Sequence, residues 1–254
     1  MLRGLIAGLI LSLFSVFTFG QTFNIIGDDD YPPFSYSDEN KQVKGIDIEL
    51  FQEVAKRLYI QINIKLVPWK RLLKMTKNGD TVGSFALFKT PEREDFSLFT
   101  HPIHYSTFKL FTTQKMGFNY SNIKDLYGKR IGIEAGFVVS EEFDKASSRG
   151  DINMIQIFSF DDAFRRLLMG GIDAFVGNNL VVKHKLKHTY KNIKNISDIF
   201  ALSKPLKKTR GAYFVLSQAF PLDDKLLWKT MFTDTLKSME QDGTSQRIVQ
   251  KYTD

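Results

Sequence analysis

The chain has 254 residues, of which 43% are hydrophobic and 25% are charged, and its formal net charge is +7. This length is sufficient for one large domain or for two domains of ordinary size, each with its own core. The chain has no cysteine, which excludes disulfides, thiolate metal sites and membrane attachment through a lipidated cysteine.

The first twenty residues have the pattern of a secretory signal peptide. Arg3 precedes an apolar run over residues 5–19, and the small residue Gly20 precedes polar Gln21. A membrane-spanning helix needs about 20 apolar residues, and this run is shorter. We therefore expect cleavage after Gly20 and a secreted, periplasmic protein that is not a lipoprotein. An uncleaved anchor is the alternative.

After this segment, short β-rich runs alternate with amphipathic stretches. Residues 23–26 and 62–67 are predicted strands. Residues 48–58 place apolar side chains on one face at helical spacing, with Asp47 as the expected N-cap. A short helix is predicted over residues 71–77, ended by Asn78-Gly79. This alternation is typical of an α/β domain built from βα units.

One pattern occurs twice in the chain. Residues 69–73, before Asn78-Gly79-Asp80, resemble residues 163–168, before the glycine turn at 170–173. Both copies are read as strand, helix, glycine turn and strand. A separation of about 95 residues is too long for a solenoid repeat. The repeat therefore predicts two similarly built lobes, each with its own sheet.

Two extended runs, residues 109–113 and 212–216, are candidates for strands that join these lobes. The lysine-rich stretch between them lacks the interleaved aromatic and basic residues that a nucleic-acid groove requires, so it indicates a solvated surface. Residues 222–251 are helical in pattern. We predict a first lobe over residues 21–111, a second lobe over 112–210, and a return to the first lobe over 211–254.

Six motifs in order carry a resemblance to a known family: Tyr31-Pro32-Pro33-Phe34, residues 45–50, 69–73, 90–96, 125–132 and 171–176. With them, nearly the whole mature chain resembles the bacterial extracellular solute-binding proteins of family 3, the polar amino-acid receptors of ABC uptake systems. The resemblance implies an α/β, two-lobed periplasmic-binding-protein-like fold of type II, with mixed sheets flanked by helices and a two-strand hinge that closes on ligand. We expect a monomer without cofactor or metal, whose partner is an inner-membrane ABC permease or a sensor protein.

Arg93 is the first candidate for contact with the ligand. A guanidinium offers a rigid fork of donors that matches a carboxylate, and the resemblance implies that Arg93 grips the ligand's α-carboxylate. Without the resemblance, pairing with nearby Glu92 or Asp95 would be the simpler interpretation. Thr90 begins the same turn, where its hydroxyl is expected to cap a helix, contact ligand, or do both.

The resemblance also places Tyr31, Phe34 and Trp69 against the ligand, with Ala86 as a further contact. Rings bury apolar area at low entropic cost and leave a polar tip for orientation. The alternative is that Phe34 and Trp69 belong to the core. Asp28 is expected to meet a polar or cationic end of the ligand, and stabilisation of the turn at residues 28–30 is an equally good interpretation.

Three positions depart from the family pattern. Asn178 stands where the family usually has an Asp that pairs with the ligand's α-ammonium, and Phe88 stands where a Ser or Thr commonly helps to hold it. An amide cannot supply the full negative charge that a buried ammonium requires. Gly136-Phe137 replaces a Gly-Thr turn and offers an anion only its backbone N–H groups. These substitutions suggest an anionic ligand without a conventional free α-amino group, more apolar than arginine or histidine.

The sequence thus predicts a solute-binding protein, not an enzyme, that captures a small carboxylate-containing solute, amino-acid-like or a related organic acid, for ABC-type uptake. A sensing or interaction protein of the same fold is the first alternative, because both roles use a surface created by closure on ligand. A small-carboxylate dehydratase is the second. His101, His104 and Glu134 are available as acids or bases, but no metal-ligand cluster or Ser/His/Asp pattern stands out.

Overall fold

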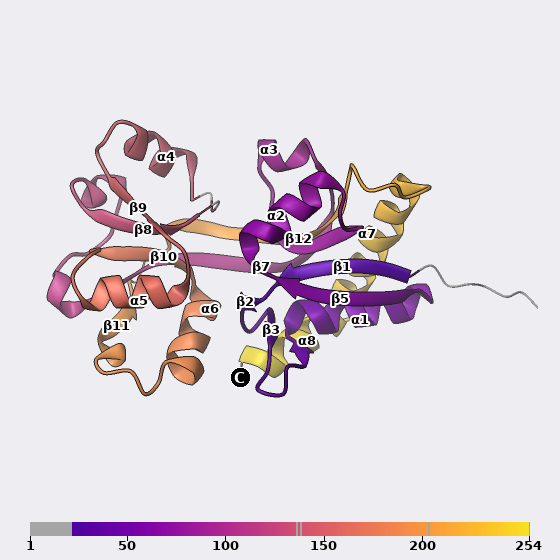
Figure 1. Ribbon diagram of the computed structural model, residues 1–254, viewed down its shortest axis with the longest axis horizontal. Helices are drawn as coiled ribbons and strands as arrows, with labels where there is room; N and C mark the ends of the chain where they lie inside the picture. The colour runs from indigo at the N-terminus through magenta and orange to yellow at the C-terminus, as the bar shows by residue number, and fades with distance from the viewer. Residues whose placement is uncertain (1–21, 136, 138, 203, 254) are drawn as a thin grey trace, which may run out of the picture.

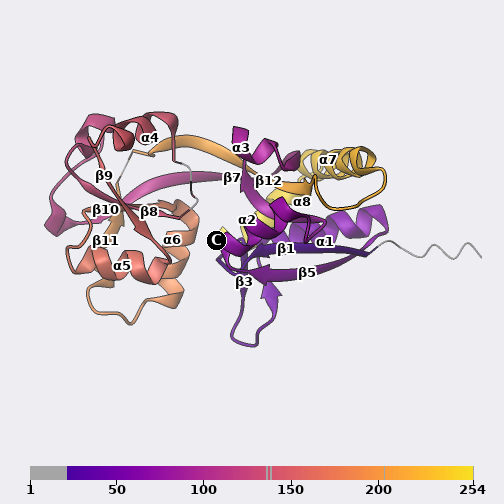
Figure 2. The ribbon, with the colours of Figure 1, turned by 45° about the horizontal axis from the view of Figure 1, so that its top comes forward.

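The structure of the protein is a computed structural model that describes residues 22–253 except 136, 138 and 203. It consists of two lobes joined by two long strands, and the C-terminal helices return to the lobe in which the described chain begins (Figures 1 and 2). The predicted signal peptide lies outside the described residues. None of the helices in the described ranges combines the length and hydrophobicity that a bilayer crossing demands.

The first lobe is built around three parallel strands, because β1 pairs in parallel with both β5 and β6. Alternate side chains of β1 pack on opposite faces: Phe23 and Ile25 belong to the main core beneath α1 and α7, whereas Ile26 joins a smaller cluster with Leu72 of α2. The elements of this lobe are β1 (Thr22–Asp28), β2 (Asp30–Tyr31), β3 (Ser35–Ser37), β4 (Val43–Lys44), α1 (Ile46–Leu58), β5 (Gln61–Val67), α2 (Trp69–Asn78), β6 (Gly83–Phe88), α3 (Pro91–Glu94), α7 (Lys225–Gln241) and α8 (Thr244–Thr253).

The second lobe repeats this plan, as the internal sequence repeat predicted. Its strand β8 pairs in parallel with β9 and β10, so the order β8-α4-β9-α5-β10 corresponds to β1-α1-β5-α2-β6. Its elements are β8 (Arg130–Glu134), α4 (Glu141–Ser148), β9 (Asn153–Ile157), α5 (Phe160–Leu168), β10 (Ala174–Asn178), α6 (Asn179–His184) and β11 (Ile199–Ala201).

Two antiparallel strands, β7 (Ser97–Thr113) and β12 (Lys207–Ser217), run through both lobes. In the first lobe β12 pairs with β6, and in the second lobe β7 pairs with β10 and β11. The expectation of a separate sheet for each lobe is therefore wrong: hydrogen bonds of the crossing strands connect the two halves into one nine-stranded sheet. The predicted lobe boundaries, 111/112 and 210/211, lie within these two strands.

The start of α1 differs from the sequence prediction. Its N-cap is Gly45, with φ 132°, and Asp47 lies inside the first turn. A Cβ at position 45 would lie 2.1 Å from the carbonyl oxygen of Phe34, so the close approach of the two backbones requires glycine. Asp47 is fully buried and does not cap the helix; its Oδ1 lies 3.3 Å from Nε2 of His104 in β7.

Candidate functional site

The carboxyl ends of the parallel strands of both lobes face each other across a cleft. Asp28, Phe88, Glu134 and Asn178 are the last residues of β1, β6, β8 and β10, and all four line this cleft. It holds about 620 Å³ of space, including its opening to solvent. Small ligands of α/β proteins bind at this edge of a sheet. The repeated topology therefore brings two such edges to one site.

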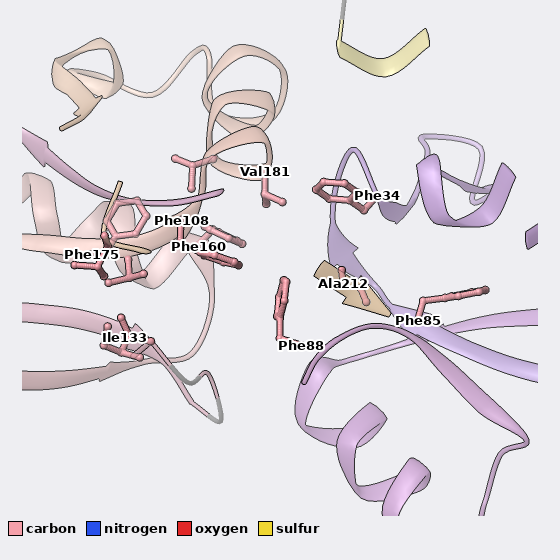
Figure 3. Close-up of a cluster of buried hydrophobic side chains, with 14 of the residues drawn as sticks. Phe34, Phe85, Phe88, Phe108, Ile133, Phe160, Phe175, Val181 and Ala212 are labelled. Atoms are coloured by element: carbon pink, nitrogen blue, oxygen red, sulfur yellow. The ribbon is translucent and has the colours of Figure 1, made fainter. Parts of the chain in front are cut away.

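Six aromatic rings line the cleft. They are Tyr31, Trp69 and Phe88 of the first lobe, Phe137 and Phe160 of the second, and Phe108 of the crossing strand β7. Figure 3 shows Phe88 projecting from the first lobe toward Phe108 and Phe160. Its ring meets the Phe108 ring edge to face, with centroids 5.1 Å apart. The rings give the cleft an apolar lining with few polar groups.

Ala86 lines the cleft, as expected from the sequence, and it has an unusual backbone conformation. Its φ is 59°, in the left-handed region, and the register between β6 and β12 shifts between Tyr213 and Val215 beside it. This irregularity is a β-bulge, which bends a strand and redirects the residues that follow. The bulge precedes Phe88 by two residues, at the end of β6 that enters the cleft.

Asn178 connects the two lobes. Its amide nitrogen donates to the hydroxyl of Tyr31 at 2.9 Å and to Oγ of Ser106 at 2.8 Å, while its Oδ1 accepts the backbone N–H of Leu180 at the start of α6. Both amide hydrogens are therefore used within the protein. Asn178 thus bridges the lobes at the cleft, and its amide has no hydrogen left to donate to a ligand in this conformation.

A buried polar chain continues behind Asn178. Ser106 Oγ lies 3.4 Å from Nδ1 of His104, whose Nε2 faces Asp47. Phe34 does not line the cleft as expected: it is 1% exposed and stacks on the His104 ring at a centroid distance of 4.0 Å. The reason is the close approach of its carbonyl to Gly45, which draws the Phe34 backbone against the start of α1. Phe34 therefore supports Tyr31 from the core side.

Two carboxyl groups face the cleft, Asp28 from the first lobe and Glu134 from the second. Burial, together with the nearby charge of Glu134, raises the pKa of Asp28 to about 8. Burial and the negative charge of Asp30 raise the pKa of Glu134 to about 7, although Lys185 acts in the opposite direction. Asp28 Oδ1 also accepts the backbone N–H of Asp30, so this residue stabilises its turn as well as facing the cleft.

Arg93 lies next to the cleft wall and is not among the residues that line it. Its side chain is buried, its Nη1 donates to the carbonyl oxygen of Phe88 at 2.9 Å, and its guanidinium lies 5.3 Å from the ring centroid of Trp69. Burial and the charge of Arg210 lower the pKa of Arg93 to about 10, so it remains a cation at neutral pH. Phe88 and Trp69, which the guanidinium contacts, both line the cleft.

The structure also bears on two further sequence expectations, and it confirms that Thr90 caps a helix. The Thr90 hydroxyl accepts the backbone N–H of Arg93 and caps α3, and Thr90 borders a separate surface hollow rather than the cleft. The backbone N–H of Phe137, expected to serve an anion, donates to the carbonyl of Glu134 at 3.0 Å because the chain turns there. The Phe137 ring does line the cleft. Gly136 lies outside the described residues.

A second contact between the lobes lies beside the cleft. A π-helical turn, Lys185–Thr189, follows α6 directly and places the buried Lys185 side chain against the carboxylate of Asp30 in β2. The same ammonium lies 5.0 Å from the centroid of the Phe160 ring. Local π-helical turns recur at functional sites. Lys185 and Asn178 together hold the lobes in contact.

Sequence reasoning missed Phe108, Phe160, Lys185 and the cleft position of Glu134. The cleft position of Glu134 could have been inferred from the similarity of the two lobes, because Glu134 ends β8 as Asp28 ends the equivalent strand β1. No group of three or more His, Asp or Glu within the described ranges is placed to hold a metal ion. The site thus combines an apolar enclosure, two acids and hydrogen bonds across the lobes with two guanidinium groups against its wall, those of Arg93 and Arg210.

Known proteins with similar sequences are named as binding proteins for arginine or cystine. A putative ABC transporter arginine-binding protein 2 of Escherichia coli (strain K12) is 30% identical over 190 residues, 74% of each chain. The ABC transporter arginine-binding protein 1 of the same organism is 27% identical over 248 residues, 94% of this chain and 95% of the relative. The L-cystine-binding protein TcyJ of that strain is 22% identical and covers 87% of this chain and 79% of its own.

Solved structures show the same fold. A histidine kinase sensor domain with similarity to periplasmic binding proteins superposes with a TM-score of 0.78 at 19% identity, over 92% of this chain and 96% of that one. An ancestral arginine-binding protein bound to arginine superposes with a TM-score of 0.75 at 22% identity, over 91% and 97%. Residues 23–254 match the family model, and this chain belongs to the bacterial extracellular solute-binding proteins, family 3.

Proposed function

We propose that the protein is a periplasmic receptor that captures an amino-acid-type solute carrying a carboxylate in its inter-lobe cleft and presents it to an ABC-type permease. The observation that carries this proposal is the ring-lined cleft between two sets of strand ends. The membership of the chain in a family of solute receptors supports the same conclusion.

Arg93 is the proposed partner of the solute's carboxylate. Its charge at neutral pH and the rigidity of its fork suit that role. Its position against Phe88 and Trp69, which form the cleft wall, brings the guanidinium close to the space where the solute would lie. A small movement of these two side chains on binding would connect the guanidinium with the cleft.

Closure of the lobes is the proposed response to solute. The hydrogen bond from Asn178 to Tyr31 and the ion pair of Lys185 with Asp30 both join residues of opposite lobes. Among the described strands, β7 and β12 are the ones that cross between the lobes, so a rotation at these strands would separate both pairs (Figure 2). A solute that contacts both lobes would bind the closed arrangement more tightly than the open one. The difference between these two affinities sets how far the solute shifts the population toward the closed arrangement.

The direct test is a thermal-shift screen of the mature protein against the common amino acids and the corresponding keto acids. A ligand that binds only the folded state at about 100 times its Kd adds about 2.7 kcal/mol to the free energy of unfolding. We expect at least one amino acid to raise the melting temperature by several degrees. A flat response to every amino acid and keto acid would contradict the proposal.

A sensing role is the second candidate, and the similarity to a histidine kinase sensor domain is the observation that favours it. Both roles use the same closed surface, so binding alone does not separate them. Stimulation of a reconstituted permease's ATPase activity by the liganded protein would support transport. Chemical conversion of a bound carboxylate, followed by chromatography, would instead support the enzyme alternative.

A further inference from the structure

A chain of buried polar side chains crosses between the lobes behind the cleft. It begins at Asn178 of β10 in the second lobe, passes through Ser106 and His104 of the crossing strand β7, and ends at Asp47 of α1 in the first lobe. The exposed fractions of these four residues range from 0% to 6%. Burial of polar groups costs free energy unless each group has a partner. Four such groups in sequence therefore indicate a role other than packing.

The direction of the first hydrogen bond is fixed by the backbone. Oδ1 of Asn178 accepts the N–H of Leu180 at the start of α6, so the amide nitrogen is the atom that faces Ser106 Oγ, 2.8 Å away. Ser106 Oγ accepts in this bond, and its own hydrogen is left for His104, whose Nδ1 lies 3.4 Å away. Nδ1 of His104 therefore carries no hydrogen.

The other end of the chain leads to the same assignment. Among the residues that the structure describes, neither carboxylate oxygen of the fully buried Asp47 has a hydrogen bond of ordinary geometry. Nε2 of His104 lies 3.3 Å from Asp47 Oδ1, so a hydrogen on Nε2 points to the group that most requires a donor. The neutral imidazole with its hydrogen on Nε2 satisfies both ends, and every hydrogen of the chain then points from Asn178 toward Asp47.

The chain lies where the two crossing strands bend. Residues 104–106 of β7 pair with residues 210–212 of β12, and the register between the strands shifts on both sides of this stretch. Such irregularities bend a strand locally. The bond to Asn178 leads from this stretch into the second lobe, and the contact with Asp47 leads into the first. The chain thus connects the two lobes through the hinge itself.

Asn178 is the member of the chain that touches the cleft. Its second amide hydrogen is donated to the Tyr31 hydroxyl of the first lobe at 2.9 Å. On the basis of the proposed function, we infer that Asp47, His104 and Ser106 are positioning residues. They hold the Asn178 amide in the orientation that bridges the lobes, and they thereby raise the affinity of the closed cleft for its solute.

Two substitutions of His104 separate positioning from packing. In His104→Asn the side-chain oxygen takes the approximate place of Nδ1 and can accept from Ser106, but the contact with Asp47 is lost. In His104→Gln the amide nitrogen takes the approximate place of Nε2 and can donate to Asp47, but the contact with Ser106 is lost. Tyr105→Phe, a change at an exposed residue of the same strand, is the control and should behave as wild type.

The two variants should differ in opposite directions for stability and for affinity. His104→Gln should melt close to the wild-type temperature and bind solute about 3- to 10-fold more weakly, the effect of one lost neutral hydrogen bond. His104→Asn should melt several degrees lower, because Asp47 loses its partner, and yet bind within about twofold of wild type. If His104 only packed, affinity would fall together with stability. Isothermal titration with L-arginine and L-glutamine as probes, below both melting temperatures, measures the affinities.

Nuclear magnetic resonance tests the chain without a solute. Long-range proton–nitrogen correlation of the four histidines, with the His104 signal assigned by its loss in His104→Gln, should show a neutral ring with its hydrogen on Nε2. The side-chain amide hydrogens of Asn178 should exchange with solvent faster in His104→Gln than in wild type. In His104→Asn they should exchange as slowly as in wild type, because the bond to Ser106 is kept.

Several results would overturn the positioning role and leave the proposed function intact. They are a hydrogen on Nδ1 of His104, unchanged affinity and amide exchange in His104→Gln, or weaker binding by His104→Asn than by His104→Gln. Ser106→Ala, which interrupts the chain at its centre, replaces any His104 variant that thermal unfolding shows to be unfolded, with the result expected for His104→Gln. If neither probe binds, the tautomer and the amide exchange decide the positioning role, and the amino-acid screen decides the proposed function.

Discussion

The two lobes have the same strand and helix order but contribute different chemistry to the cleft. The first lobe provides a rigid aromatic wall and a buried guanidinium, because Trp69 and Phe88 are held against Arg93 by short contacts. The second lobe provides groups that act across the gap, Glu134, Asn178 and Lys185. On the proposed function, the first lobe would position a solute and the second lobe would close over it.

The largest expected effect is the loss of the first lobe's positive charge. Arg93→Ala should weaken binding of amino-acid solutes at least 100-fold by isothermal titration, since removing one member of a buried charge pair costs about 2–5 kcal/mol. Arg71→Ala, a change at an exposed residue of the neighbouring helix α2, is the matched control. Retention of wild-type affinity by a folded Arg93→Ala protein would assign carboxylate recognition to another group.

The next effect concerns the acids of the cleft in the absence of ligand. Because the pKa values of Asp28 and Glu134 are raised from 3.8 and 4.5 to about 8 and about 7, the folded state holds protons that the unfolded state releases. Their contribution to stability is therefore lost as the pH rises from about 4 to about 8. Glu134→Gln should melt at the wild-type temperature near pH 4 and several degrees higher at pH 8.

Melting curves recorded between pH 4 and pH 9 measure this difference. Equal or lower melting temperatures for Glu134→Gln across the whole range would mean that Glu134 is not destabilised in the ligand-free cleft. In that case the Glu134 carboxyl would add no electrostatic cost to the second lobe's side of the cleft.

A smaller effect is expected at the ion pair that joins the lobes. Lys185→Met keeps the apolar packing over Phe160 but removes the charge that contacts Asp30. Because Asp30 is 53% exposed, its carboxylate can be hydrated again, and we expect a change in solute Kd of about 3- to 10-fold. Small-angle scattering should show a larger radius of gyration for the liganded variant. Lys187→Met, at an exposed residue of the same turn, should behave as wild type.

The smallest effect is expected for Tyr31→Phe, which removes one hydroxyl. The Asn178 amide would lose its 2.9 Å hydrogen bond across the cleft but keep its bonds to Ser106 and Leu180. A neutral hydrogen bond contributes about 0.5–1.5 kcal/mol, so solute affinity should fall about 2- to 10-fold by titration. An unchanged Kd would show that this bond does not contribute to closure.

Much of the fold was predictable because local patterns and global topology agree. The strand at residues 23–26, the helix ended at Gly79 and the repeat at residues 163–173 are all present. Each rests on side-chain periodicity or on a glycine in a left-handed turn. The single sheet was not predictable, since strand pairing through β7 and β12 depends on contacts between distant segments.

The site was predictable only in part, because a motif gives a position in the chain and not the direction of a side chain. Trp69 and Ala86 line the cleft, whereas Phe34, three residues from the cleft residue Tyr31, is turned into the core. Asn178 has its hydrogen-bonding hydrogens occupied by partners 72 and 147 residues away. No local sequence pattern contains that information.

Movement of the lobes around a bound solute is the central claim, and a distance measurement tests it most directly. Since the chain has no cysteine, Lys74→Cys in α2 and Lys145→Cys in α4 provide two unique sites, both exposed and on opposite lobes (Figure 1). Pulsed electron spin resonance between labels at these sites should show a broad distribution without solute and a narrower, shorter one with a bound amino acid. Identical distributions with and without a solute that titration shows to be bound would contradict the account.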